Sequence, residues 1–321
     1  MYWASACGGC EISLLDTGQH FLELTEHFQL VFCPCLVDAK KKDIEELPDG
    51  AISVTFFNGS VRNSENEAMA RLLRRKSRML VAYGSCAHEG CVTGLSNLSS
   101  LSGHFDAVYL DNPSTNNVSK VAPCGKAKVP EGDLELPGFS DTVKPLSLIV
   151  EVDYTIPGCP PEPGSIMTAT ELIMRGELPP KGSVMGGGPS IVCRQCPRKR
   201  EEKKIGRIFR TFEIVPEDGS CLLDQGIICM GIVTREGCGA PCPAANMPCT
   251  GCYGPAEGIA DQGAKMVSAI GTVLDPGETK GFSEAEIAAK IDAIIDDIHD
   301  YTGTFYKYSL AGSILRKAFR R

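Results

Sequence analysis

Residues 79–90 read MLVAYGSCAHEG, an apolar run that ends in a glycine turn carrying a cysteine. The run Met79–Tyr83 is short, apolar and followed by glycine, which is typical of a buried strand in a parallel sheet. Cys86 therefore follows the carboxyl end of a strand. In open α/β sheets ligands bind at that edge, so this stretch predicts an α/β fold with a thiol at its ligand-binding edge.

The first half of the chain repeats the alternation of strand and helix. Apolar residues recur at helical spacing in Glu11–Phe28 and Asn66–Lys76, and a further helix is expected at Glu162–Arg175. The pattern predicts an open, mostly parallel sheet with helices on both sides. Residues 110–145, rich in Asn, Ser, Pro, Gly and charge, predict a long surface excursion. Strands are expected at residues 1–6, Gln29–Cys33, Ile52–Phe57, Met79–Tyr83 and Leu146–Val152.

Two more cysteine turns belong with Cys86. CGGCE begins at Cys7, and PGCPPEP contains Cys159. Each follows a candidate strand, so three distant positions can meet at one sheet edge. Cys7-Gly-Gly-Cys10 before a helix is also the arrangement of a redox dithiol. Together the motifs favour a 4Fe–4S cluster, because they supply four thiolates from tight turns.

Eight more cysteines lie between Cys193 and Cys252, as Cys-x2-Cys, two single cysteines, Cys-x3-Cys and Cys-x2-Cys. Eight thiolates suit two further 4Fe–4S clusters, although spacing alone permits several pairings. Zinc sites also use Cys-x2-Cys pairs, so a zinc-stabilised structural protein is a rival interpretation. Disulfides fit poorly, because the chain has an adequate apolar content and shows no secretory signal.

The stretch LPPKGSVMGGGPS begins at Leu178 and divides the chain. It predicts a linker rather than a phosphate loop, because no strand precedes it and no Gly-Lys-Ser/Thr follows. We expect domains at residues 1–178 and 179–321. The second is expected to be mostly irregular, with helices at Ile259–Ile270 and Glu284–Tyr301.

Composition limits the partners. The 321 residues carry a formal charge of −8 and a sequence pI of about 5.3, which argues against nucleic acid as a main partner. No stretch is apolar over the roughly 18 residues of a membrane span. With no leader pattern at the N-terminus, a cytoplasmic location is expected.

With these motifs in this order, the chain resembles the small subunit of nickel–iron hydrogenases. The resemblance rests on CGGCEISLLD, GSCA, IPGCPPEP, GCGAPCP and MPCTGCYGP, and it covers nearly the whole length. It implies a flavodoxin-like domain followed by an iron–sulfur domain. It also implies a partner large subunit that splits H2, while this chain does no bond-making itself. The proximal set of ligands would be Cys7, Cys10, Cys86 and Cys159.

The resemblance also divides the later cysteines between two 4Fe–4S clusters. Cys193 stands where uptake-type relatives usually have histidine, and a thiolate there should lower the reduction potential. Cys242 stands where many relatives have a proline and a three-iron centre, which indicates a fourth thiolate here. The distal set would be Cys193, Cys196, Cys221 and Cys229, and the medial set Cys238, Cys242, Cys249 and Cys252.

The branch is indicated by ANMPCTGCYGP and by GTFYKYSLAGSILRK near the C-terminus. Both resemble the methyl-viologen-reducing hydrogenases of methanogenesis, which pass electrons to heterodisulfide reductase, an iron–sulfur and flavin partner. Deazaflavin-reducing and sulfur-reducing hydrogenases are close alternatives. A cluster subunit of NADH:quinone oxidoreductase is a further rival, but adjacent cysteines and no second cluster domain are expected there.

Several residues have competing interpretations. Asn58 stands where many relatives have a carboxylate, so any role of that carboxylate is in doubt. Glu11 and His88 lie near cysteine motifs but are equally well explained as a helix-terminal carboxylate and a surface turn. The remaining cysteines are expected to be small buried hydrophobic residues. They are Cys33, Cys35, Cys91 and Cys124.

Overall fold

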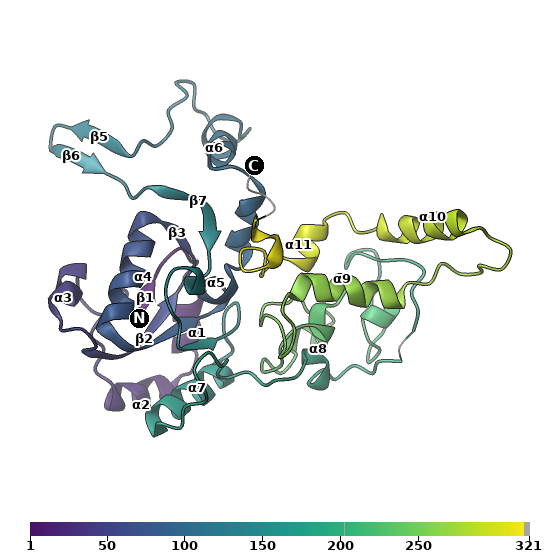
Figure 1. Ribbon diagram of the computed structural model, residues 1–321, viewed down its shortest axis with the longest axis horizontal. Coiled ribbons are helices and arrows are strands. Elements are labelled where there is room, and N and C mark those ends of the chain that lie inside the picture. Colours follow the sequence, from purple (N-terminus) through teal and green to yellow (C-terminus); the bar gives the residue numbers. More distant parts are fainter. Residues whose placement is uncertain (202, 318–321) are drawn as a thin grey trace.

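The computed structural model describes residues 1–201 and 203–317. An α/β body forms the first half, and an elongated lobe of helices and loops forms the second (Figure 1). The body is built on a parallel sheet in the order β1-β2-β4-β8, as the sequence predicts. Its strands are β1 (Tyr2–Trp3), β2 (Ile52–Asn58), β4 (Ser77–Tyr83) and β8 (Tyr154–Ile156).

Helices cover both faces of this sheet. Successive side chains of a strand point to opposite faces, and β4 shows this clearly. Leu80 packs in a core with α4 (Ser64–Lys76), whereas Val81 packs in a core with α7 (Pro163–Arg175). The remaining helices of the body are α1 (Gly9–Leu15), α2 (Gln19–His27), α3 (Lys41–Glu46), α5 (Ser85–Glu89) and α6 (Leu101–Phe105), and the short helical turns are η1 (Val92–Leu98), η2 (Asp106–Leu110) and η3 (Leu146–Leu148).

The expected strand at Gln29–Cys33 is wrong, because this segment is an irregular loop. β1 is only two residues long and offers little edge for another strand to pair with. The expected strand at Leu146–Val152 is also wrong. Pro145 begins the turn η3 there, and the strand β8 forms only at Tyr154.

The expected single helix over Glu11–Phe28 is two helices, α1 and α2. Gly18 separates them with a φ of +61°, a conformation that glycine adopts at little cost. The surface excursion contains an exposed hairpin, β5 (Lys126–Val129) with β6 (Gly132–Glu135). It ends in β7 (Phe139–Lys144), which pairs antiparallel with β3 (Val61–Asn63).

The second lobe packs around α9 (Gln262–Val273), whose Met266 and Ile270 are buried. α10 (Glu284–Ile295) projects from one end, and α11 (Tyr301–Phe305) packs beside α9 (Figure 1). The helix expected to reach Tyr301 ends earlier, at Ile295. Short elements complete the lobe: α8 (Pro241–Ala244), η4 (Val192–Arg194), η5 (Leu223–Gln225), η6 (Met230–Ile232) and η7 (Ile314–Lys317).

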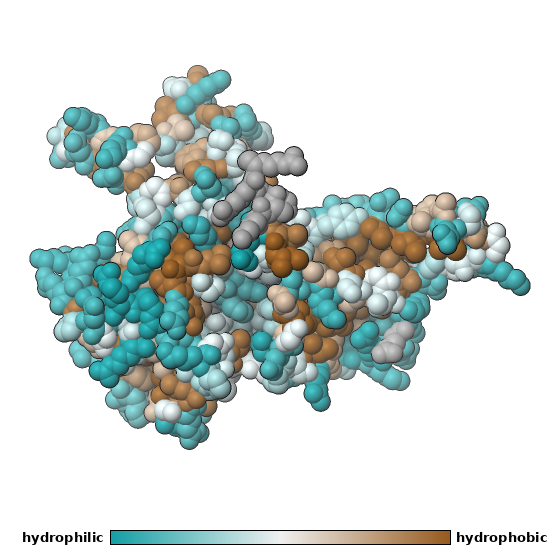
Figure 2. Space-filling model, in the orientation of Figure 1, coloured by the Kyte–Doolittle hydropathy of each residue, from teal (hydrophilic) through white to brown (hydrophobic). Residues whose placement is uncertain are grey.

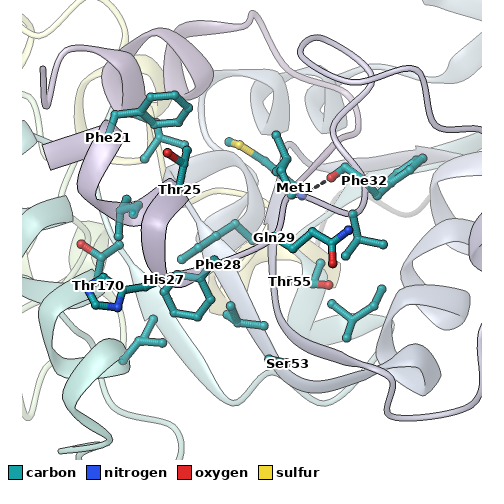
Figure 3. Close-up of a pocket in the computed structure, with 18 of the residues that line it drawn as sticks. Met1, Phe21, Thr25, His27, Phe28, Gln29, Phe32, Ser53, Thr55 and Thr170 are labelled. Atoms are coloured by element: carbon teal, nitrogen blue, oxygen red, sulfur yellow. Dashed lines mark hydrogen bonds between the residues drawn. The ribbon is translucent and has the colours of Figure 1, made fainter. Parts of the chain in front are cut away.

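A cavity of about 340 Å³ lies in the body between α2, α7 and the first residues of β2 (Figure 3). Its lining is largely apolar and includes Phe21, Phe28 and Phe56. The amino group of Met1 donates to the carbonyl of Phe32 at one side of this cavity. None of its lining residues is a cysteine, so the cavity is separate from the cysteine motifs.

Candidate metal centres

The three proximal motifs follow the carboxyl ends of β1, β4 and β8, as the sequence predicts. Cys7 is exposed in the turn before α1, and Cys10 is buried in the first turn of that helix. The thiol of Cys10 interacts with those of Cys86, Cys159 and Cys7. A Cβ on Gly84 would lie 2.4 Å from the Sγ of Cys10, so only glycine permits this approach.

Burial and neighbouring thiols raise the pKa of Cys10 well above its ordinary value. Hydrogen bonding by the Cys91 thiol lowers the pKa of Cys159 to about 7, against the effect of burial. The same thiol lowers the pKa of Cys86. Cys91 is thus buried, as expected, but it contacts two proximal thiols rather than only apolar groups. Its Sγ lies 3.5 Å from that of Cys159.

The other unassigned cysteines differ from one another. Cys33 is buried as expected, but Cys35 and Cys124 are exposed, so the expectation is wrong for these two. Cys35 follows Pro34 in a turn outside the sheet. Cys124 lies in the surface excursion, where its thiol donates to the carbonyl of Lys126 over 3.1 Å.

The four cysteines of the distal set lie around one small cavity. Burial, with smaller contributions from the thiols of Cys229, Cys221 and Cys196, raises the pKa of Cys193 to about 12. The rest of the cavity wall is largely apolar. It is lined by Val192, Cys193, Cys196, Arg198, Cys221, Leu222, Leu223, Cys229, Gly231, Ile232 and Pro243.

The medial set lies between the other two. Burial raises the pKa of Cys252 to about 12, and the thiols of Cys238, Cys159 and Cys242 contribute. Cys249 has a raised pKa, first through burial and then through Cys229. Its own N–H donates to the Sγ of Cys229 over 3.3 Å. The structure therefore brings members of the medial set into contact with both neighbouring sets.

Backbone N–H groups donate to several of these sulfurs. The N–H groups of Gly231 and Cys249 lower the pKa of Cys229, against the larger effect of burial. The N–H of Ala240 likewise lowers the pKa of Cys238, and the N–H of Gly251 lowers that of Cys249. Such donors stabilise thiolate charge and tune the potential of sulfur-ligated metal centres.

Direct hydrogen bonds join the body to the second lobe beside the medial set. The Ser85 hydroxyl donates to the carbonyl of Cys252. The Tyr253 hydroxyl accepts from the N–H of Glu162 over 2.8 Å and lies 3.1 Å from the Ser165 hydroxyl. The N–H of Cys159 lowers the pKa of Cys252, against the larger effect of burial. These contacts fix the medial motif against the proximal one.

The donor atoms of the three sets are all cysteine sulfurs, which suit iron–sulfur clusters. Among the described residues, no three cysteine, histidine or carboxylate side chains converge closely enough to bind one ion. Twelve thiolates in apolar, N–H-rich turns suit iron–sulfur chemistry.

Two residues weighed from the sequence have defined contacts. The Asn58 amide donates to the Glu11 carboxylate, and Asn58 is fully buried. A neutral amide thus takes the place of a second carboxylate beside Glu11. His88 is half-buried in α5 rather than in a surface turn, and desolvation lowers its pKa to about 4.

An α/β body joined to a lobe of converging cysteines defines an iron–sulfur protein, and comparison with known proteins defines which kind. The family described as NADH ubiquinone oxidoreductase, 20 Kd subunit, matches residues 7–173. The iron–sulfur subunit of the F420-non-reducing hydrogenase of Archaeoglobus profundus is 37% identical over 97% of this chain and 95% of its own length. The corresponding subunit of the Methanothermobacter marburgensis F420-non-reducing hydrogenase is 34% identical over 98% and 94%.

The chain belongs to the family of the 20 Kd subunit, and within it the chain is the small subunit of a nickel–iron hydrogenase. It is therefore a subunit of a hydrogenase, which is an oxidoreductase. A solved NAD+-reducing [NiFe]-hydrogenase chain is 29% identical over 54% of this chain and 87% of its own, with a TM-score of 0.45. No helix in the described part of the chain has the length and apolar character needed to cross a membrane.

Proposed function

We propose that this chain relays electrons between the H2-splitting site of its large subunit and an external acceptor, through three 4Fe–4S clusters. The proximal, medial and distal sets would each hold one cluster through four thiolates. Such clusters supply one-electron transfer when bound. The chain's own contribution is to position them, bury them and set their potentials through N–H donors and ligand charge.

The observation that carries the proposal is the contact between successive sets. Ser85, which precedes Cys86 of the proximal set, donates its hydroxyl to the carbonyl of Cys252 of the medial set. Cys249 of the medial set donates its N–H to Cys229 of the distal set. The three sets would therefore hold their clusters in a line, with the medial set joined by a hydrogen bond to each neighbouring set. Separate structural zinc sites would not need this continuity.

We place the domain division at residues 178 and 179, with the proximal set in residues 1–178 and the other sets in 179–321. We place the large subunit on the face around Cys7 and α1. Trp3, Ile12 and Leu15 are exposed large apolar residues there, although such residues are usually buried. Apolar side chains are visible in several surface groups in Figure 2.

We propose that the acceptor is a low-potential iron–sulfur or flavin partner of the heterodisulfide reductase type, in the cytoplasm. Three relatives with near-complete coverage are named as hydrogenases that do not reduce F420, a deazaflavin. This favours the methyl-viologen-reducing branch over the deazaflavin-reducing one. The sulfur-reducing alternative has a weaker match, since the delta subunit of sulfhydrogenase 2 of Pyrococcus furiosus is 28% identical over 78% of the chain.

Interrupting the medial set tests the relay. In the anaerobically purified complex, Cys238→Ala with Cys242→Ala removes two medial ligands and leaves Cys249 and Cys252 in place. We expect H2 to reduce the proximal cluster but not the distal one, whereas dithionite reduces both. Electron paramagnetic resonance under each reductant measures which clusters are reduced.

Cys221→Ala is the matched control, because it affects the distal set at the far end of the line. H2 should still reduce the proximal and medial clusters in this variant. Full reduction of the distal cluster by H2 in the medial variant would contradict the relay.

A further inference from the structure

We propose that Cys91 is a reserve ligand of the proximal set, able to replace Cys159 on iron. The inference rests on the proposed function, because it requires a cluster at the proximal set. Cys91 would be a fifth thiol beside the four of the proximal set, and its contacts determine which of those four it can replace.

The Cys91 side chain lies against two sulfurs of the proximal set. Its Sγ donates to the Sγ of Cys159 over 3.5 Å, and its thiol also hydrogen-bonds Cys86. Only 2% of the residue is exposed. A cysteine that served only as a small hydrophobic residue would pack on carbon, whereas this one lies between two ligand sulfurs.

The turn that carries Cys91 holds it there. The N–H of Gly94 donates to the carbonyls of both Gly90 and Cys91. Gly90 and Gly94 both press against Ala311, where an added Cβ would lie 2.5 and 3.0 Å from the Ala311 Cβ. The turn that carries Cys91 is therefore packed against a segment near the C-terminus, which restricts its movement.

The backbone of Cys91 has an unusual conformation. Its φ is +52°, a region where side chains other than those of glycine, asparagine and aspartate are uncommon. Glycine would adopt this conformation without strain. A cysteine held in such a conformation with its sulfur against two ligands indicates a role for the sulfur itself.

The exchange balances without any other reactant. The Cys91 thiol gives its proton to the departing sulfur of Cys159 along the existing S–H···S contact. The Cys91 thiolate then forms the bond to iron that Cys159 has left. One proton moves between two cysteines of the same chain, and no electron is gained or lost. Because Cys159 is exposed and Cys91 is buried, the exchange moves one ligand into the interior.

Four variants of the anaerobically purified hydrogenase complex test the inference. Cys159→Ala should keep a complete proximal cluster, held by Cys91, with about twelve iron per chain as three cubanes require. Adding Cys91→Gly, which suits the positive φ, should abolish that cluster or leave a three-iron remnant. Iron and sulfide analysis with electron paramagnetic resonance of the oxidised complex measures both outcomes.

Cys91→Gly alone should retain all three clusters, which separates loss of the reserve ligand from misfolding. Cys7→Ala is the matched control, because Cys7 forms no hydrogen bond with Cys91 among the described residues. It should lose the proximal cluster or leave a three-iron remnant even with Cys91 present. Equal loss of iron in Cys159→Ala and in the double variant would overturn the inference. Zinc in place of iron in the wild type would instead reject the proposed function.

Discussion

At the scale of single residues, His88 and Glu89 show what burial does to ionisable groups where the two halves meet. Burial raises the pKa of Glu89 to about 8, assisted by Asp261 and opposed by Arg235. Burial, assisted by the charge of Arg235, lowers the pKa of His88 to about 4. Gly254 of the second lobe packs against both side chains, since its added Cβ would lie 3.0 Å from a Glu89 oxygen.

These two pKa values give opposite pH dependences. Between pH 4.5 and 8 folded Glu89 holds a proton that the unfolded chain has released, so stability falls as pH rises. Between pH 4 and 6.5 folded His88 lacks a proton that the unfolded chain binds, so stability rises with pH. Of these two residues, only Glu89 makes the stability depend on pH between pH 6.5 and 8.

Glu89→Gln should therefore flatten the pH dependence of stability between pH 6.5 and 8. In the wild type, the free energy of unfolding should fall through Glu89 by at most about 1.4 kcal/mol per pH unit in this window. Anaerobic thermal unfolding of the complex across this range measures the slope. Glu177→Gln is the exposed control and should leave the slope unchanged. An identical slope in wild type and Glu89→Gln would reject this account of the carboxyl group.

At the scale of elements, α9 and α11 depend on a glycine contact. A Cβ on Gly263 of α9 would lie 2.4 Å from the Tyr306 ring, which follows α11. Gly271 lies on the same helix with open space around it. The two glycines therefore separate the packing effect of a methyl group from its effect on helix propensity.

Gly263→Ala should destabilise the chain by about 1–3 kcal/mol, because Tyr306 must move to admit the methyl group. Gly271→Ala should stabilise it by roughly 0.5–1 kcal/mol through helix propensity alone. Anaerobic denaturant unfolding of the full chain, followed by circular dichroism, measures both. A gain in stability from Gly263→Ala would show that the helices do not pack this closely.

Elements with long amphipathic periodicity were predictable from the sequence, and those decided by one backbone conformation were not. The predictions for α4 and α7 were confirmed, because each repeats apolar residues at helical spacing and packs on the sheet. The break at Gly18 and the turn at Pro145 depend on single residues inside apolar runs. The β5–β6 hairpin is exposed on both faces, so no alternation of burial marked its strands.

At the scale of the whole molecule, the proximal site was predictable because its cysteines follow strands of one parallel sheet. The division of the eight later cysteines was not predictable from spacing, and it rested on resemblance. The contact between Cys91 and Cys159 joins residues 68 positions apart through the turn at Gly90. No local sequence pattern predicts a contact between residues so far apart in the chain.

Iron, sulfide and zinc analysis of the anaerobically purified chain shows whether its twelve thiolates hold three cubanes. We expect about twelve iron and about twelve sulfide per chain, as three cubanes require. Stoichiometric zinc with little sulfide would contradict it, and would leave the cysteines as structural ligands rather than as the line of an electron relay.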